Sequence, residues 1–169
     1  ASTIIGCHTL SFEPSVENYK ILNSNVQLNN VQSTIKLYNY ALGDKNESKT
    51  IGFKGAMSYI TNNKRLNLQR TVVKKLDNIV TYANLLKIDV EGYEEFVLKG
   101  AKGVLSHPKT NAIIIELAGY NNRYGSSNEK VHNLLIQHNF FPIKYFPYER
   151  VFNRLKTYRK NQYNTIYIR

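Results

Sequence analysis

Residues 85–101 read LLKIDVEGYEEFVLKGA, and this stretch decides which fold we expect for the chain. A short apolar strand ends at Asp89, then Glu91 and Gly92 follow, and an amphipathic helix begins at once. Ligands of open α/β sheets bind just outside the carboxyl ends of the strands. We therefore predict that Asp89 and Glu91 face a ligand-binding crevice of this kind.

Two other predicted strands also end in an acidic residue. Glu13 follows a strand expected over residues 7–12 and comes just before a helix. Glu116 closes the apolar run over residues 112–116. Three strand ends that carry acids predict a single ligand site with an acidic rim.

The remaining sequence alternates between strand and helix patterns. This alternation predicts an α/β fold with a mainly parallel sheet, helices on both faces and an antiparallel pair of strands at the C-terminal end. A charged hairpin or short helix is expected between the last two strands, and an irregular Asn-rich loop between residues 53 and 70. We expect strands over residues 34–42, 49–53, 70–74, 85–90, 112–117, 140–146 and 163–168, and helices over residues 18–28 (with Ser15 as N-cap), 91–105 and 127–138.

Length and composition favour one packed domain over residues 1–169. At 169 residues the chain is long enough to bury roughly 70% of its unfolded surface, and 42% of its residues are hydrophobic. No apolar run approaches the roughly 20 residues of a membrane helix, and no signal peptide is visible. Cys7 is the one cysteine, which excludes an internal disulfide and favours a reducing compartment, so we expect a cytoplasmic location.

The net charge of +11 favours contact with an anionic partner, which leaves nucleic acid, an anionic membrane surface and an acidic glycan open. The basic residues gather in two stretches, 64–75 and 150–160. Aromatic residues interleave the second stretch, as in surfaces that stack on bases. The alternative is a solvated face in a chain rich in Lys, Asn, Ile and Tyr.

Glu13 has two alternative roles on the sequence alone. A carboxylate that ends a strand before a helix can accept hydrogen bonds from both hydroxyls of a ribose. The same carboxylate can instead cap the N-terminus of the helix that follows.

The acids near the second half of the chain leave three chemical roles open. Asp89, Glu91 and Glu116 could act as a general base, as ligands of a hard divalent cation, or as acceptors for a cationic ligand. Stabilisation of a helix N-terminus explains Glu94 and Glu95 but not the strand-end residue Asp89. The sequence shows no metal-ligand spacing of its histidines, no nucleophile elbow and no phosphate loop.

Taken in order, the segments of this chain resemble the FkbM-type family of S-adenosylmethionine-dependent methyltransferases. The likeness covers about residues 10–168, and its most specific part is the Lys-Ile-Asp-Val-Glu-Gly run at residues 87–92. The segments that carry it are 12–19, 25–30, 41–44, 75–79, 86–101, 113–117 and 164–168.

The resemblance implies a Rossmann-like class I methyltransferase sheet, mostly parallel, whose final strand is inserted antiparallel. It implies S-adenosylmethionine as the cofactor and methylation of a hydroxyl, often on a sugar or small metabolite. By this resemblance Glu13 matches the acid that holds the ribose, and Ala41 and Leu42 match the segment that passes the adenine. Asp89 and Glu91 match the acids beside the methyl-transfer site. The candidate catalytic residues are Asp89, Glu91 and Glu116; the candidate cofactor-binding residues are Gly6, Glu13, Ala41, Leu42 and Asp89; no metal ligand is assigned.

One departure from the family pattern concerns the N-terminal region. Residues 4–10 resemble the end of the family's glycine-rich turn, yet Glu13 comes only seven residues after Gly6, whereas about 20 residues are usual. We therefore expect the first strand and the glycine-rich loop to be missing or truncated. The alternative function is an inactive domain of the same fold that binds nucleic acid or a glycan through a basic face.

Overall fold

The computed structural model describes residues 6–54, 57–61, 68–160 and 162–169. The chain packs into two compact units. Unit 1 comprises residues 1–42 and 46–74, and unit 2 comprises residues 43–45 and 75–169. The single domain expected over residues 1–169 stays a prediction. No helix of the described residues is long and apolar enough to cross a membrane.

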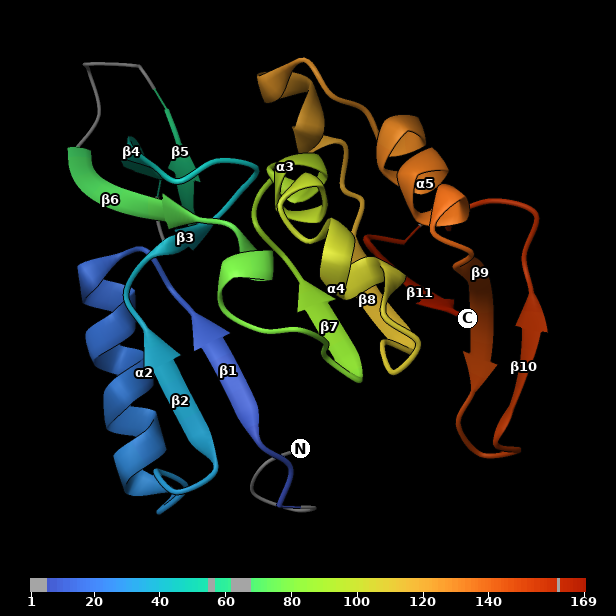
Figure 1. The fold of residues 1–169 in the computed structure, drawn as a ribbon, viewed down its shortest axis with the longest axis horizontal. Helices are drawn as coiled ribbons and strands as arrows, with labels where there is room; N and C mark the ends of the chain where they lie inside the picture. Colours follow the sequence, from blue (N-terminus) through green and yellow to red (C-terminus); the bar gives the residue numbers. More distant parts are fainter. Residues whose placement is uncertain (1–5, 55–56, 62–67, 161) are drawn as a thin grey trace. The chain divides into compact units, whose positions relative to one another are not determined.

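Unit 1 begins with a strand–helix–strand segment (Figure 1). Strands β1 (Thr9–Phe12) and β2 (Ile35–Tyr38) pair in parallel, and helix α2 (Val16–Leu28) connects them. The predicted N-cap is confirmed, because the Ser15 hydroxyl oxygen accepts a hydrogen bond from the Asn18 backbone N–H at 3.2 Å.

The second sheet of unit 1 has the strand order β3-β6-β4-β5. Strands β3 and β6 run parallel, whereas β4 is antiparallel to both β5 and β6. The four strands are β3 (Ala41–Leu42), β4 (Glu47–Lys54), β5 (Met57–Ile60) and β6 (Leu68–Lys74).

Two expectations for unit 1 are wrong. Residues 34–42 do not form one strand, because β2 ends at Tyr38 and the chain then enters the other sheet as β3. Asn39 lies at this crossing, and its side-chain amide donates to the Glu13 carbonyl oxygen at 2.8 Å. The Asn-rich region expected to be an irregular loop contains β5, which pairs with β4. Strand pairing with a partner elsewhere in the chain overrode weak local strand propensity there.

Unit 2 contains a five-stranded sheet with the order β10-β9-β11-β8-β7. Strands β7 and β8 run parallel, and β11 lies between β8 and β9 and is antiparallel to both. The expected antiparallel strand at the C-terminal end is therefore confirmed. The strands are β7 (Leu85–Ile88), β8 (Ala112–Glu116), β9 (Phe141–Phe146), β10 (Val151–Arg154) and β11 (Asn164–Ile168).

The expected mostly parallel Rossmann-like sheet is not confirmed, because the sheets of the described residues are mixed. The short connection over residues 147–150 joins β9 to β10, and a connection of this length forces an antiparallel hairpin. The expected alternative of a hairpin or a short helix is thereby settled in favour of the hairpin.

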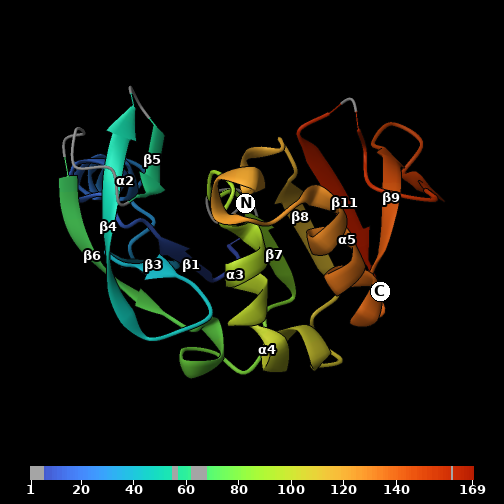
Figure 2. The ribbon, with the colours of Figure 1, turned by 90° about the horizontal axis from the view of Figure 1, so that it is seen from above.

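Three α-helices of unit 2 lie on one face of its sheet (Figures 1 and 2), and α3 packs against α5. Buried apolar residues from strands and helices form the core, among them Leu98, Ile113, Ile115 and Leu135. The helical elements are α3 (Glu94–Lys99), α4 (Lys102–Ser106), α5 (Asn128–Gln137) and the 3-10 helices η1 (Leu76–Asn78) and η2 (Tyr120–Tyr124).

The helix expected over residues 91–105 is two helices, α3 and α4, and it starts late. Gly100 separates them, and a Cβ atom there would collide with the carbonyl oxygen of Gly43, so the backbones approach too closely for a side chain. The N-terminus of α4 is capped from outside the helix, because the Asp77 carboxylate accepts hydrogen bonds from the N–H groups of Gly103 and Val104, both at 3.0 Å.

Candidate active site

The register of β7 and β8 brings two of the predicted acids together. Ile88 pairs with Ile115 in the parallel ladder, so Asp89 and Glu116 follow at the same carboxyl edge of the sheet. Burial raises the pKa of Glu116 to about 7, and the charge of Asp89 and a side-chain hydrogen bond to Asp89 add to this rise. Asp89 and Glu116 therefore form a carboxyl pair, in which Glu116 exchanges its proton near neutral pH.

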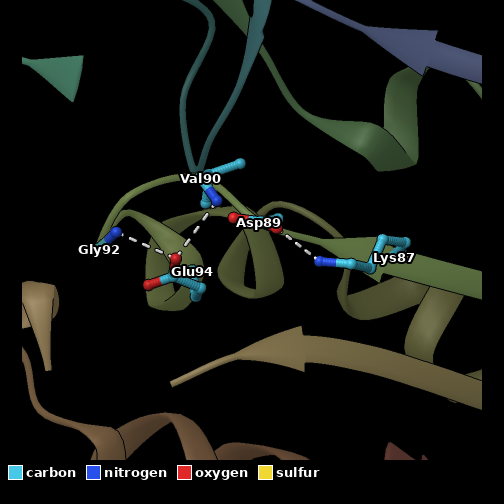
Figure 3. Close-up of polar contacts among 5 residues, drawn as sticks. All are labelled: Lys87, Asp89, Val90, Gly92 and Glu94. Carbon is cyan, nitrogen blue, oxygen red and sulfur yellow. Dashed lines mark hydrogen bonds and ion pairs between the residues drawn. The ribbon is translucent and has the colours of Figure 1, made fainter. Parts of the chain in front are cut away.

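Asp89 also has a cationic neighbour, which lies two residues back on β7. The Lys87 ammonium is 2.7 Å from Oδ2 of Asp89, and both side chains are about half exposed (Figure 3). An exposed ion pair of this kind stabilises the fold little. It places a cation beside Asp89 at this edge of the sheet.

The turn between β7 and α3 has an unusual backbone. Glu91 has a φ of 55° and Gly92 a φ of 101°, and both lie in the left-handed region. This turn is why the helix begins at Glu94 rather than at Glu91, as expected from the sequence. The Glu91 side chain is partly exposed, and its pKa is raised by burial and by the charge of Asp89, against the opposing charge of Arg123.

Glu94 is the site residue that sequence reasoning missed. Only 1% of its surface is exposed, although the sequence pattern explained it as an exposed acid at a helix N-terminus. Its Oε1 atom accepts from the backbone N–H groups of Gly92 at 3.0 Å and Val90 at 3.4 Å (Figure 3), and its Oε2 atom accepts from the Asn121 amide at 2.6 Å. Burial raises the pKa of Glu94, and the hydrogen bonds from Gly92 and Val90 oppose the rise.

Glu95 fits the simpler explanation given for both residues. Its carboxylate pairs with Lys99 one turn along α3, at 2.6 Å. Burial acts to raise the pKa of Glu95, but the hydrogen bonds to Lys99 and Ser126 and the charges of Lys99 and Lys130 together outweigh it, and the pKa is lowered. A signal for the different role of Glu94 was present in the sequence, since it follows Gly92 by two residues and can fold back onto the turn.

Three acceptor atoms at this site are buried and lack a hydrogen-bond donor within the described part of the chain. They are Oε2 of Glu91, Oε2 of Glu116 and Oδ1 of Asn121. Buried acceptors without donors cost roughly 1–3 kcal/mol each. These acceptors therefore fit a ligand that brings hydroxyl or ammonium hydrogens. Among the described residues no group of three His, Cys, Asp or Glu is arranged to hold a metal ion.

Of the predicted cofactor-binding residues, only Asp89 lies in unit 2; the others belong to unit 1. Glu13 follows β1, and one of its carboxylate oxygens accepts from the Ser15 backbone N–H at 2.7 Å. Burial raises the pKa of Glu13, while the bonds from Ser15 and Asn18 oppose the rise. Glu13 therefore does take part in starting α2, which was the alternative to ribose binding, and its ribose role stays a prediction.

The remaining predicted cofactor residues of unit 1 are Ala41 and Leu42, in strand β3, and Gly6, which precedes β1. Ala41 is buried in β3, where it pairs with Val73, and Leu42 pairs with Lys74. Gly6 is exposed and has a φ of 64°, as a glycine in a turn can. Ile4 and Ile5, which belong to the expected glycine-rich turn, lie outside the described residues. The structure thus brings Asp89, Glu91 and Glu116 together, while their roles in a ligand site, like that of Glu13, stay predictions.

The α/β fold has a last strand that runs antiparallel between two neighbours and acids at the ends of adjacent parallel strands, and both features agree with what the resemblance implies. The family model described as "Methyltransferase FkbM domain" matches residues 2–142. The chain belongs to this family, and the resemblance seen in the sequence is confirmed.

A solved structure supports the fold. The crystal structure of methyltransferase FkbM from Methylobacillus flagellatus KT superposes with a TM-score of 0.54 at 17% sequence identity. The match covers 96% of this chain and 36% of that chain, so the present chain spans little more than a third of the longer protein. At this identity the likeness shows the fold alone. No curated protein sequence matches the chain significantly.

Proposed function

We propose that this protein is an S-adenosylmethionine-dependent methyltransferase that methylates a hydroxyl oxygen of a sugar or small metabolite. Membership of the FkbM family supports the methyltransferase class. The observation that carries the reaction type is the carboxyl pair of Asp89 and Glu116, in which the pKa of Glu116 is raised to about 7. A group with a pKa near the working pH serves well as a general base.

The chain's own residues supply binding and proton transfer in this reaction. The cofactor, when bound, provides an electrophilic methyl group on a positively charged sulfur. With the cofactor bound, the carboxyl pair would take the proton of the acceptor hydroxyl as its oxygen receives the methyl group. Alignment of the two reacting atoms supplies much of the rate, and the pair is held at one sheet edge by the β7–β8 register.

The residues present fit the cofactor in their chemistry. Glu13 accepts from the Ser15 N–H and also bonds the Asn18 side chain, and a carboxylate suits the ribose hydroxyls. Ala41 and Leu42 are proposed to lie along the adenine, and Gly6 near the amino-acid end. The orphaned acceptors of Glu91 and Glu116 suit a ligand rich in hydrogen-bond donors.

Calorimetric titration with S-adenosylmethionine and S-adenosylhomocysteine tests the cofactor assignment. We expect saturable binding in the micromolar range to a chain whose folding is checked by circular dichroism. Release of S-adenosylhomocysteine on addition of sugars and other hydroxyl compounds would then identify the acceptor class. A folded chain that binds neither compound at millimolar concentration would exclude the proposal.

The anionic partner expected from the net charge also stays a proposal, and the β9–β10 hairpin is the best candidate for its contact. Tyr148 is 95% exposed at the turn, and Phe152 lies directly opposite Tyr145 in the ladder. Arg154 stacks over Phe141 with 4.4 Å between the guanidinium carbon and the ring centre. Retention on heparin, which is an anionic glycan, should fall in an Arg150→Ser, Arg154→Ser variant; unchanged retention would exclude this face.

A further inference from the structure

The buried carboxylate of Glu94 binds the turn that carries two of the candidate catalytic acids. It accepts the N–H groups of Val90 and Gly92, which flank Glu91 (Figure 3). Glu91 is held at a φ of 55°, where a residue with a side chain is strained. Strain of this kind persists only when surrounding contacts enforce it, and the two bonds to Glu94 are such contacts.

The second oxygen of Glu94 reaches the segment that follows β8. Asn121, in η2, is 1% exposed and donates its amide to Oε2 of Glu94 at 2.6 Å. The two backbones also touch, because a Cβ atom on Gly92 would lie 2.5 Å from the carbonyl atoms of Tyr120. The turn after β7 carries Asp89, and β8 ends at Glu116, so this contact joins the two halves of the carboxyl pair.

We propose that Glu94 and Asn121 are a pair of positioning residues that fixes Asp89 against Glu116. Glu94 is buried and already accepts three hydrogen bonds, so it acts through the turn and does not itself receive the substrate proton. The position of Asp89 beside Glu116 can be tested whether or not the chain transfers methyl groups. Its importance for catalysis rests on the proposed function.

The hydrogen-bond roles make the pair unusually open to testing. In Glu94→Gln the side-chain carbonyl keeps both bonds to the turn, while its amide meets the amide of Asn121. Because Oδ1 of Asn121 has no donor among the described residues, a flip of the Asn121 amide restores that bond. Asn121→Asp alone sets two carboxylates against each other, and adding Glu94→Gln supplies the missing donor.

The experiment follows the titration of the Glu116 carboxyl by carbon-13 NMR in each variant. We expect the pKa of Glu116 to fall from about 7 toward its ordinary value in Glu94→Ala, because Asp89 is no longer held beside it. Glu94→Gln removes the same negative charge but keeps the contacts, so it isolates the small direct effect of that charge. Glu95→Gln, which alters the contacts of Glu95 with Lys99 and Ser126 but none of the bonds to the turn, is the matched control and should leave the titration unchanged.

Asn121→Asp should disturb the titration, and Glu94→Gln in the same chain should restore it. The inference is overturned if Glu94→Ala and Glu94→Gln titrate alike, or if the double variant behaves no better than Asn121→Asp. Thermal melts accompany each variant. If Glu94→Ala does not fold, Asn121→Ala takes its place, since it removes the bond between Glu94 and Asn121 without changing the charge; an unchanged pKa of Glu116 would then overturn the inference.

Turnover gives an independent readout once an acceptor is known. Misplacement of a catalytic group can cost about 100-fold in rate, so Glu94→Ala should lower kcat while the KM for the cofactor stays within a small factor. Glu94→Gln should recover most of the rate. If the wild-type chain transfers no methyl group, the proposed function fails, yet the titration comparison still decides the positioning role.

Discussion

Two junctions of this chain have the same sequence pattern and different surroundings. Glu13 after β1 and Asp89 after β7 each end an apolar strand just before a helix. One carboxylate oxygen of Glu13 accepts from the backbone N–H of Ser15, the N-cap of its own helix. Asp89 lies beside a second acid on the neighbouring strand, and its turn is held by a third. The role of an acid at a strand end therefore depends on which residue ends the neighbouring strand.

The largest effect is expected at the Asp89 junction. Asp89→Asn should lower kcat by about 100- to 10,000-fold, the usual range for loss of a general base, and should affect cofactor affinity much less. Single-turnover kinetics and calorimetry with S-adenosylhomocysteine measure the two quantities. Equal losses of rate and affinity would assign Asp89 a structural or cofactor-binding role instead.

The pH dependence of kcat and of stability tests the role of Glu116 beside Asp89. A general base must be unprotonated, so kcat should rise with pH through about 7, and Glu116→Gln should remove this limb. The folded-state pKa of Glu116 is raised above its ordinary 4.5, so the folded state binds this proton more tightly. Its contribution to stability is therefore fully present below pH 4.5 and is lost as pH rises through about 7. If the melting temperature of Glu116→Gln fell with rising pH as steeply as that of the wild type, this assignment would be contradicted.

Gly92→Ala tests how tightly the turn after β7 is packed. The substitution adds strain at a φ of 101° and a collision with the backbone of Tyr120, so we expect destabilisation of about 2–3 kcal/mol. Gly119→Ala is the matched control, because its φ of 83° is also left-handed but a Cβ there meets nothing within 4 Å. Chemical denaturation should show a clearly smaller loss for the control. Equal losses would mean that backbone strain alone sets the cost.

The smallest effect is expected at the Glu13 junction. Glu13→Gln keeps an acceptor for the Ser15 N–H but weakens hydrogen bonds to ribose hydroxyls, so affinity for S-adenosylhomocysteine should fall about tenfold with little change in melting temperature. Ser15→Ala, in contrast, should cost about 1 kcal/mol of stability and leave affinity alone. Unchanged affinity in Glu13→Gln would leave Glu13 with only its role at the start of α2.

Local patterns predicted a large part of the fold and of the site. The apolar runs of β7 and β8, the serine cap of α2 and the acids at the strand ends were all readable, because each depends on neighbours along the chain. The break between α3 and α4 was not readable, since it comes from the close approach of Gly100 to Gly43. Strand β5 was missed for the same reason, as its partner lies on another strand.

The sequence by itself determined that this chain is a member of the FkbM family with acids where its strands end, because strand period, capping and motif are local properties. Tertiary structure decided which acids meet. The β7–β8 register set Asp89 beside Glu116, and burial then moved the pKa of Glu116 to about 7. The partner of Glu94 is Asn121, 27 residues away, and no local pattern reports a hydrogen bond across that separation.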